Sequence, residues 1–135
     1  MTNINSTEYI EFVRQTTSPC SSDPEELIGR IRELESEGVK LTHLLTFALG
    51  ASAEIGEAVE IVKKCLFQGK SFNEDAKTHL IKECSDTFWY LAQLCIAMGV
   101  DFEDIMQINY DKLTARYPEG HFTISRSENR KAGDI

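Results

Sequence analysis

Three features are scarce in this sequence: proline, paired cysteines and long apolar runs. The only prolines are Pro19, Pro24 and Pro118, so none interrupts residues 25–117. Proline inside a helix removes a hydrogen bond and clashes with the preceding turn, so its absence permits long helices there. No stretch approaches the roughly 20 apolar residues that span a bilayer, and the segment MTNINSTEYIEF lacks the basic and apolar regions of a secretion signal. We therefore expect a cytoplasmic protein without membrane contact.

The cysteines are Cys20, Cys65, Cys84 and Cys95, which are widely separated and form no CxxC pair. This spacing disfavours both a zinc ribbon and a dithiol redox motif. Because a free cysteine behaves as a small apolar residue, we expect reduced, mostly buried thiols.

Positive charge is also in short supply. The 14 Lys and Arg residues face 22 Asp and Glu residues, which gives a formal net charge of -8. Such a chain would repel the phosphates of nucleic acid rather than neutralise them, so no nucleic-acid partner is expected. An acidic protein can still bind a polyanion through metal ions.

Helix-forming patterns fill most of the chain and predict an all-α fold, a helical bundle of about four to five helices. The length of 135 residues favours a single domain over 1–135, with a polar C-terminal tail from about residue 118. Asp23 and Pro24 are suited to begin a helix, and Gly38, Gly69 and Gly99 are suited to follow the ends of others. The predicted helices span about residues 7–16, 24–38, 40–68, 73–99 and 101–117.

The segment TFWYLAQLCIAMGV, residues 87–100, is apolar nearly all round. A helix that is apolar on every side must be covered on every side, which a small bundle does less easily than an oligomer. We therefore expect a homo-oligomer, a dimer or tetramer, with this segment near the interface.

Two acidic pairs on consecutive predicted helices carry the chemistry. Glu54 and Glu57 form an ExxE pair, and Glu83 and Asp86 form an ExxD pair. Residues three apart on a helix share a face, so each pair can direct two carboxylates to one point. Two antiparallel helices would bring all four carboxylates together, at a cost of several kcal/mol unless they are protonated or neutralised by cations.

Magnesium is the natural neutralising ion, with manganese as the alternative. Hard cations prefer oxygen ligands, and magnesium commonly bridges protein carboxylates to substrate phosphates. A di-iron bundle typically needs a Glu-x-x-His pair, and His43, His79 and His121 do not have this spacing. A solvated acidic face is the simplest alternative for a single ExxE, but both pairs border apolar helix stripes.

The acidic motifs resemble those of the MazG-like all-α nucleoside triphosphate pyrophosphohydrolases, whose signature is ExxE on one helix and ExxD on the next. The resemblance continues through DTFWYLAQLCIAMGVDFEDIM to NYDKLTARYPEG and covers about residues 41–130. It implies hydrolysis of a (d)NTP to the (d)NMP and pyrophosphate by attack of water at the α-phosphorus. It also implies Mg²⁺ ligands at Glu54, Glu57, Glu83 and Asp86, with Glu54 as the residue that takes the water's proton.

The same resemblance makes four residues candidates for nucleotide contact: Asn109, Lys112, Arg116 and Tyr117. Lys112 and Arg116 are four apart on one helix and suit phosphate binding, although they can also be solvated surface cations. Independently of the family, Lys63 could reach a phosphate from the helix of Glu54, and His43 could stack on a base.

Other functions stay open at this stage. Within the enzyme class, the chain could be a dUTPase-like enzyme or a phosphoribosyl-ATP pyrophosphohydrolase, since both have related acidic helices. From a different class, it could be a non-catalytic helical interaction or regulatory module. Metal-dependent release of pyrophosphate distinguishes the enzymes from the module.

Overall fold

The computed structural model describes residues 5–129, which form seven helices and no strand. Five helices correspond to the five predicted ones, and their ends agree within about two residues. The all-α prediction is therefore confirmed. The helices are α1 (Ser6–Thr16), α2 (Pro19–Ser22), α3 (Pro24–Ser36), α4 (Leu41–Phe67), α5 (Glu74–Met98), α6 (Phe102–Arg116) and α7 (Ile124–Glu128).

Local capping explains where the long helices begin and end. The Asp23 side chain accepts a hydrogen bond from the backbone N–H of Glu25 at 2.9 Å, and Pro24 occupies the first turn of α3. Asn73 caps α5 in the same way through the N–H of Ala76 at 3.0 Å. At the other end of α5, Gly99 has φ 67°, a left-handed conformation that glycine adopts without steric cost.

Two short helices, α2 and α7, were not predicted. Helix α2 lies in the segment SPCSSDP, which contains two prolines and looks like a helix breaker. Helix α7 lies in the segment predicted as a polar tail and is capped by Thr123, whose side chain accepts from the N–H of Arg126. The last six residues of that predicted tail lie outside the described residues.

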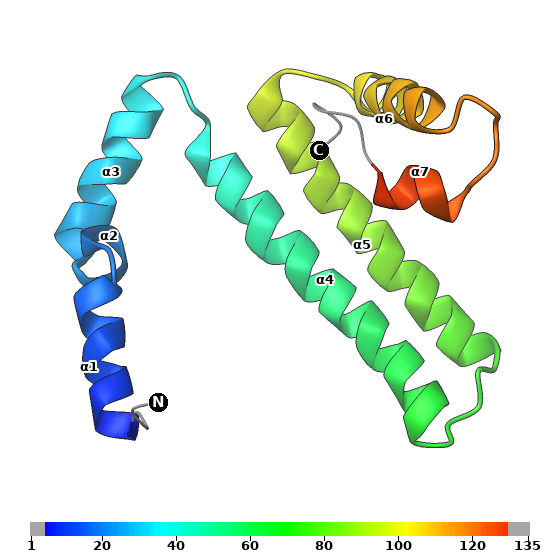
Figure 1. The fold of residues 1–135 in the computed structure, drawn as a ribbon, viewed down its shortest axis with the longest axis horizontal. Coiled ribbons are helices and arrows are strands. Elements are labelled where there is room, and N and C mark those ends of the chain that lie inside the picture. The colour runs from blue at the N-terminus through cyan, green and yellow to red at the C-terminus, as the bar shows by residue number, and fades with distance from the viewer. Residues whose placement is uncertain (1–4, 130–135) are drawn as a thin grey trace. The chain divides into compact units, whose positions relative to one another are not determined.

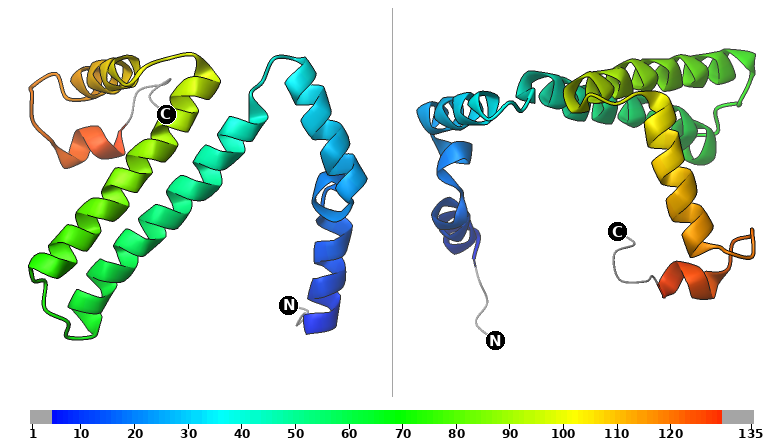
Figure 2. Two further views of the ribbon diagram at one scale, coloured as in Figure 1. Left: turned by 180° about the vertical axis from the view of Figure 1, so that it is seen from behind. Right: turned by 90° about the horizontal axis from the view of Figure 1, so that it is seen from above.

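The chain divides into two compact units between Leu41 and Thr42. The first contains α1 to α3. In the second, α4 and α5 form a long antiparallel hairpin, and α6 leaves it at the C-terminal end of α5 (Figures 1 and 2). Whether both units belong to one domain stays a prediction.

Burial in the described chain is sparse and concentrated on the hairpin. Ile61 on α4 and Cys95 on α5 are its buried apolar side chains, and Glu83 on α5 is its buried charged one. All four cysteines are free, as predicted, but only Cys95 is buried, so the expectation of mostly buried thiols was wrong. Within residues 5–129, no helix has the length and apolar character needed to cross a membrane.

Candidate metal and nucleotide site

Contacts along the hairpin fix how the two acidic motifs face each other. Near one end, His43 Nδ1 of α4 lies 2.7 Å from Gln93 Oε1 of α5. Farther along α4, Gly50 lies against the ring of Tyr90, and a Cβ atom on Gly50 would be only 1.9 Å from Tyr90 Cε1. Residue numbers rise along α4 as they fall along α5, so Glu54 and Glu57 come next to Glu83 and Asp86.

Three of the four predicted metal ligands lie together. Oxygen atoms of Glu54, Glu83 and Asp86 all lie within 4.8 Å of one another. Glu83 is only 6% exposed, Glu54 is half-buried and Asp86 is exposed. The cluster therefore lies at the boundary between the hairpin interior and solvent.

The electrostatics of this cluster are unfavourable without a cation. Partial burial, a hydrogen bond with the Glu83 carboxyl group and the neighbouring negative charges raise the pKa of Glu54 above its ordinary value. A hydrogen bond between two carboxyl groups requires that one of them be protonated. A proton or a metal ion can relieve the same repulsion.

Glu57 belongs to a second group that shares Glu83 with the first. Ligand atoms of Glu57, His79 and Glu83 also lie within 4.8 Å of one another. His79 Nε2 is 2.7 Å from Glu83 Oε1, and the two residues are four apart on α5. The four carboxylates therefore form two overlapping groups around Glu83 rather than one.

Sequence reasoning missed His79 as a site residue. The sequence lacks the Glu-x-x-His spacing of di-iron bundles, so no histidine was predicted as a metal ligand. The spacing of four from His79 to Glu83 also places both side chains on one helix face, and this signal was available.

The candidate nucleotide contacts lie on another element. Asn109, Lys112 and Arg116 are on α6, and Tyr117 is the residue that follows it. The Tyr117 ring packs against Phe122, with ring centroids 5.8 Å apart. Helix α6 turns away from the hairpin (Figure 2), whereas the acidic groups lie near the middle of α4 and α5.

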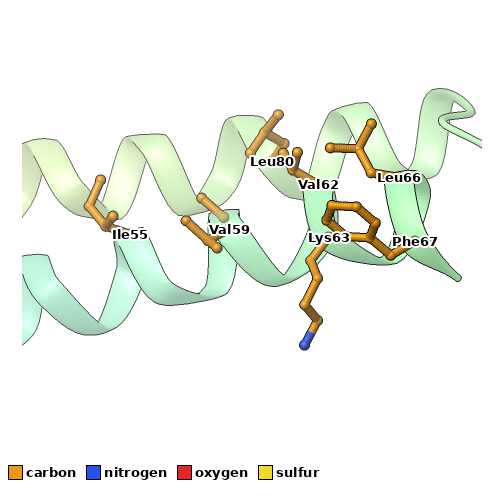
Figure 3. A pocket seen from close by; sticks show the side chains of 8 residues that line it. Ile55, Val59, Val62, Lys63, Leu66, Phe67 and Leu80 are labelled. Atoms are coloured by element: carbon orange, nitrogen blue, oxygen red, sulfur yellow. The ribbon is translucent and has the colours of Figure 1, made fainter.

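The two candidates on α4 both have partners in the chain. Lys63 forms an ion pair with Glu60, and its ammonium group points away from the neighbouring apolar side chains (Figure 3). His43 is half-buried and forms a hydrogen bond with Gln93. Neither belongs to the two acidic groups.

These features describe an all-α protein with a carboxylate cluster between two antiparallel helices. A sequence model described as the MazG nucleotide pyrophosphohydrolase domain matches residues 42–121, which is more than half of the chain. The matched range contains nearly all of α4 and all of α5 and α6. The chain therefore belongs to the MazG nucleotide pyrophosphohydrolase family. No curated protein and no solved structure gives a significant match.

Proposed function

We propose that this protein is a magnesium-dependent nucleoside triphosphate pyrophosphohydrolase that converts a (d)NTP and water to the (d)NMP and pyrophosphate. Family membership supports the reaction class. The observation that carries the proposal for this chain is the cluster of Glu54, Glu83 and Asp86, with Glu83 almost fully buried. An isolated carboxylate is costly to bury unless it is paired, protonated or bound to a metal ion.

The donor set fits magnesium, with manganese as the alternative. It consists of carboxylate oxygens close enough together to share one ion, and such oxygens are the ligands that hard cations prefer. We propose Glu54, Glu57, Glu83 and Asp86 as the residues that hold the metal. When bound, the metal supplies positive charge that neutralises the phosphate oxygens.

In this proposal Glu54 is the general base. It accepts a proton from the water molecule whose oxygen forms a bond to the α-phosphorus, while the bond from that phosphorus to the bridging oxygen breaks and pyrophosphate leaves. Glu57, Glu83 and Asp86 act as ligands.

Six other residues are proposed to bind the nucleotide. Lys112, Arg116 and Lys63 have the positive charge that phosphate groups require. His43, Asn109 and Tyr117 offer ring faces or hydrogen-bonding groups to the base and sugar. Because α6 turns away from the hairpin (Figure 2), its residues would approach the carboxylates only after a movement of α6 or from a second copy of the chain.

We further propose that the protein is a homo-oligomer. An open apolar hollow of about 480 Å³ lies along the hairpin (Figure 3). It is lined by Ile55, Ala58, Val59, Val62, Lys63, Leu66, Phe67 and Leu80. Leu66 is 69% exposed and Phe67 is 81% exposed, and on α5 Phe88 and Trp89 are exposed too. An apolar patch of this extent is unusual on a soluble monomer, and a second copy is the occupant that we propose.

The remaining parts of the proposal are a cytoplasmic location, a nucleotide as the partner and no binding to nucleic acid or membranes. Two other enzyme functions, dUTPase-like activity and phosphoribosyl-ATP pyrophosphohydrolysis, are tested by the choice of substrates below. A non-catalytic module would release no pyrophosphate from any of them.

The test is a panel of the eight common ribo- and deoxyribonucleoside triphosphates, with phosphoribosyl-ATP added, assayed for pyrophosphate with magnesium and with chelator. We expect metal-dependent release from at least one nucleoside triphosphate. In ¹⁸O-labelled water, the label should enter the monophosphate and not the pyrophosphate, because the water attacks the α-phosphorus. Label in the pyrophosphate, or no release from any substrate, would contradict the proposal.

A further inference from the structure

The acidic site has a nitrogen-bearing neighbour that an all-oxygen magnesium site does not need. His79 lies on α5 one turn before Glu83, and its Nε2 atom is 2.7 Å from Glu83 Oε1. The His79 side chain is 58% exposed and that of Glu83 is 8% exposed. The imidazole therefore lies at the solvent side of the buried carboxylate.

Glu57 brings a third ligand atom to the same point from α4. The ligand atoms of Glu57, His79 and Glu83 lie within 4.8 Å of one another. Ligands bound to one ion at roughly 2.0–2.2 Å are separated by up to about 4.4 Å, so small side-chain adjustments suffice for all three to bind one ion. A hydrogen bond between His79 and Glu83 needs no third group. The additional position of Glu57 beside them is what makes the arrangement suited to a metal ion.

This nitrogen-containing group differs in chemistry from the oxygen group of Glu54, Glu83 and Asp86. Imidazole is a good ligand for transition metals such as zinc, nickel and iron, whereas magnesium prefers oxygen. Manganese prefers oxygen too, but as a transition metal it binds imidazole more readily than magnesium does. Two carboxylates and a neutral imidazole also carry a charge of -2, which balances one divalent ion.

The other two histidines do not offer this arrangement. His43 Nδ1 lies beside Gln93 Oε1, and His121 Nδ1 lies 3.1 Å from the backbone oxygen of Glu119. Within the described residues, neither belongs to a cluster of metal-ligating side chains.

We propose that Glu57, His79 and Glu83 form a transition-metal site adjacent to the all-oxygen site, with Glu83 as the ligand that the two sites share. The inference rests on the proposed metal centre of Glu54, Glu57, Glu83 and Asp86, and it adds His79 as a ligand beside Glu57 and Glu83. It implies that Mn²⁺ binds the protein through nitrogen as well as oxygen and that His79 selects transition metals over magnesium.

Pulsed electron paramagnetic resonance tests the proposal without any turnover. Mn²⁺ bound to the full chain should give an electron spin echo modulated by a directly coordinated ¹⁴N nucleus, and labelling histidine with ¹⁵N should change the modulation frequency. In His79→Gln this modulation should disappear. His121→Gln removes an imidazole elsewhere and should retain it.

Isothermal titration calorimetry adds a second readout. His79→Gln should weaken Mn²⁺ binding at least about tenfold, since even loss of an outer partner of a metal ligand commonly costs that much. Its affinity for Mg²⁺ should stay close to that of the unaltered protein. Because His79 is exposed, we expect the variant to fold, which its circular-dichroism spectrum checks.

The outcomes separate this inference from the proposed function. Mn²⁺ bound without nitrogen modulation, or modulation that persists in His79→Gln, would overturn the role of His79 while leaving the pyrophosphohydrolase proposal intact. Absence of bound Mn²⁺ would overturn the nitrogen-containing site. A separate result, the absence of pyrophosphate release in the substrate panel, would overturn the proposed pyrophosphohydrolase activity.

Discussion

At the scale of single residues, Glu83 links the two halves of the candidate site. It is the buried charged residue of the described chain, and it is close to Glu54 and Asp86 on one side and to Glu57 and His79 on the other. Removing the charge of Glu83 should therefore weaken the binding of every cation that the site holds. Glu54 is the member of the site whose pKa is raised, through partial burial, the hydrogen bond with Glu83 and the neighbouring negative charges.

The raised pKa of Glu54 predicts how the stability of the metal-free protein depends on pH. Below its ordinary pKa of 4.5, Glu54 is protonated in both the folded and the unfolded state, so Glu54→Gln should change stability little. As the pH rises from 4.5 through the raised pKa, the folded protein must deprotonate an unfavourably placed carboxyl group and loses stability. In chelator, the Tm advantage of Glu54→Gln over the unaltered protein should grow between pH 4 and pH 7.

Glu60 on the same helix provides a control of opposite sign. Hydrogen bonds that Lys63 and Lys64 donate to the Glu60 carboxylate lower the pKa of Glu60. The contribution of Glu60 to stability is therefore present above its ordinary pKa of 4.5 and is lost as the pH falls through the lowered pKa. Glu60→Gln should therefore lower Tm at pH 7 and have less effect near pH 3. A Tm difference for Glu54→Gln that is independent of pH would contradict the account of Glu54.

At this scale the sequence predicted on which helices the acidic residues lie. The spacing of three within each acidic pair places Glu54 and Glu57 on one helix and Glu83 and Asp86 on the next. Which carboxylates group together depends on the register of two helices, and the sequence pattern does not specify that register. His79 was not predicted as a ligand because its spacing of four from Glu83 differs from the Glu-x-x-His spacing of di-iron bundles.

At the scale of elements, the close approach of α4 and α5 depends on a glycine. Gly50 admits the ring of Tyr90 one turn before Glu54, where any Cβ atom would overlap the ring. Gly56 lies in the same helix, and a Cβ atom there would meet nothing within 4 Å. The two glycines thus occupy the same type of backbone but different surroundings.

These surroundings predict opposite effects of the same substitution. Gly50→Ala should destabilise the protein by about 1–2 kcal/mol, because overpacking outweighs the gain in helix propensity. Gly56→Ala should stabilise it by about 0.5–1 kcal/mol through helix propensity alone. Chemical denaturation monitored by circular dichroism measures both values, and equal changes in the two variants would show that Tyr90 does not pack on Gly50.

Helix positions were the easiest feature to predict. Side chains such as Asp23 and Asn73 at the starts, and glycines after the ends, are local signals that the structure uses as the sequence suggests. The short helices α2 and α7 contain only four and five residues, too few to produce an apolar period. Long-range packing, such as Gly50 against Tyr90, has no local signal.

At the scale of the whole molecule, the exposed apolar surface of the hairpin supports the proposed homo-oligomer. A standard protein interface buries about 1,600 Å² in total, and the hollow with its exposed rim supplies side chains suited to one. The nearly uniform apolar character of residues 87–100 led to the same expectation from the sequence.

The proposed assembly can be tested by placing charge in the hollow. Phe67→Lys should convert the oligomer to a smaller species in light scattering coupled to size-exclusion chromatography, because a buried unpaired charge opposes association. Lys77→Glu alters charge at an exposed position of α5 and should leave the mass unchanged. The proposed interface would be contradicted if the protein without substitutions is a monomer. It would also be contradicted if Phe67→Lys has the same mass in solution as that protein.

The central claim is that the carboxylates between α4 and α5 hold the metal that drives hydrolysis of a nucleoside triphosphate. The most direct measurement compares magnesium-dependent pyrophosphate release by the unaltered protein, Glu83→Gln and Glu60→Gln, with Mg²⁺ binding measured on the same samples. We predict that Glu83→Gln loses at least about 100-fold in rate and loses Mg²⁺ binding, while Glu60→Gln retains both. Full activity and Mg²⁺ binding in Glu83→Gln would contradict the account.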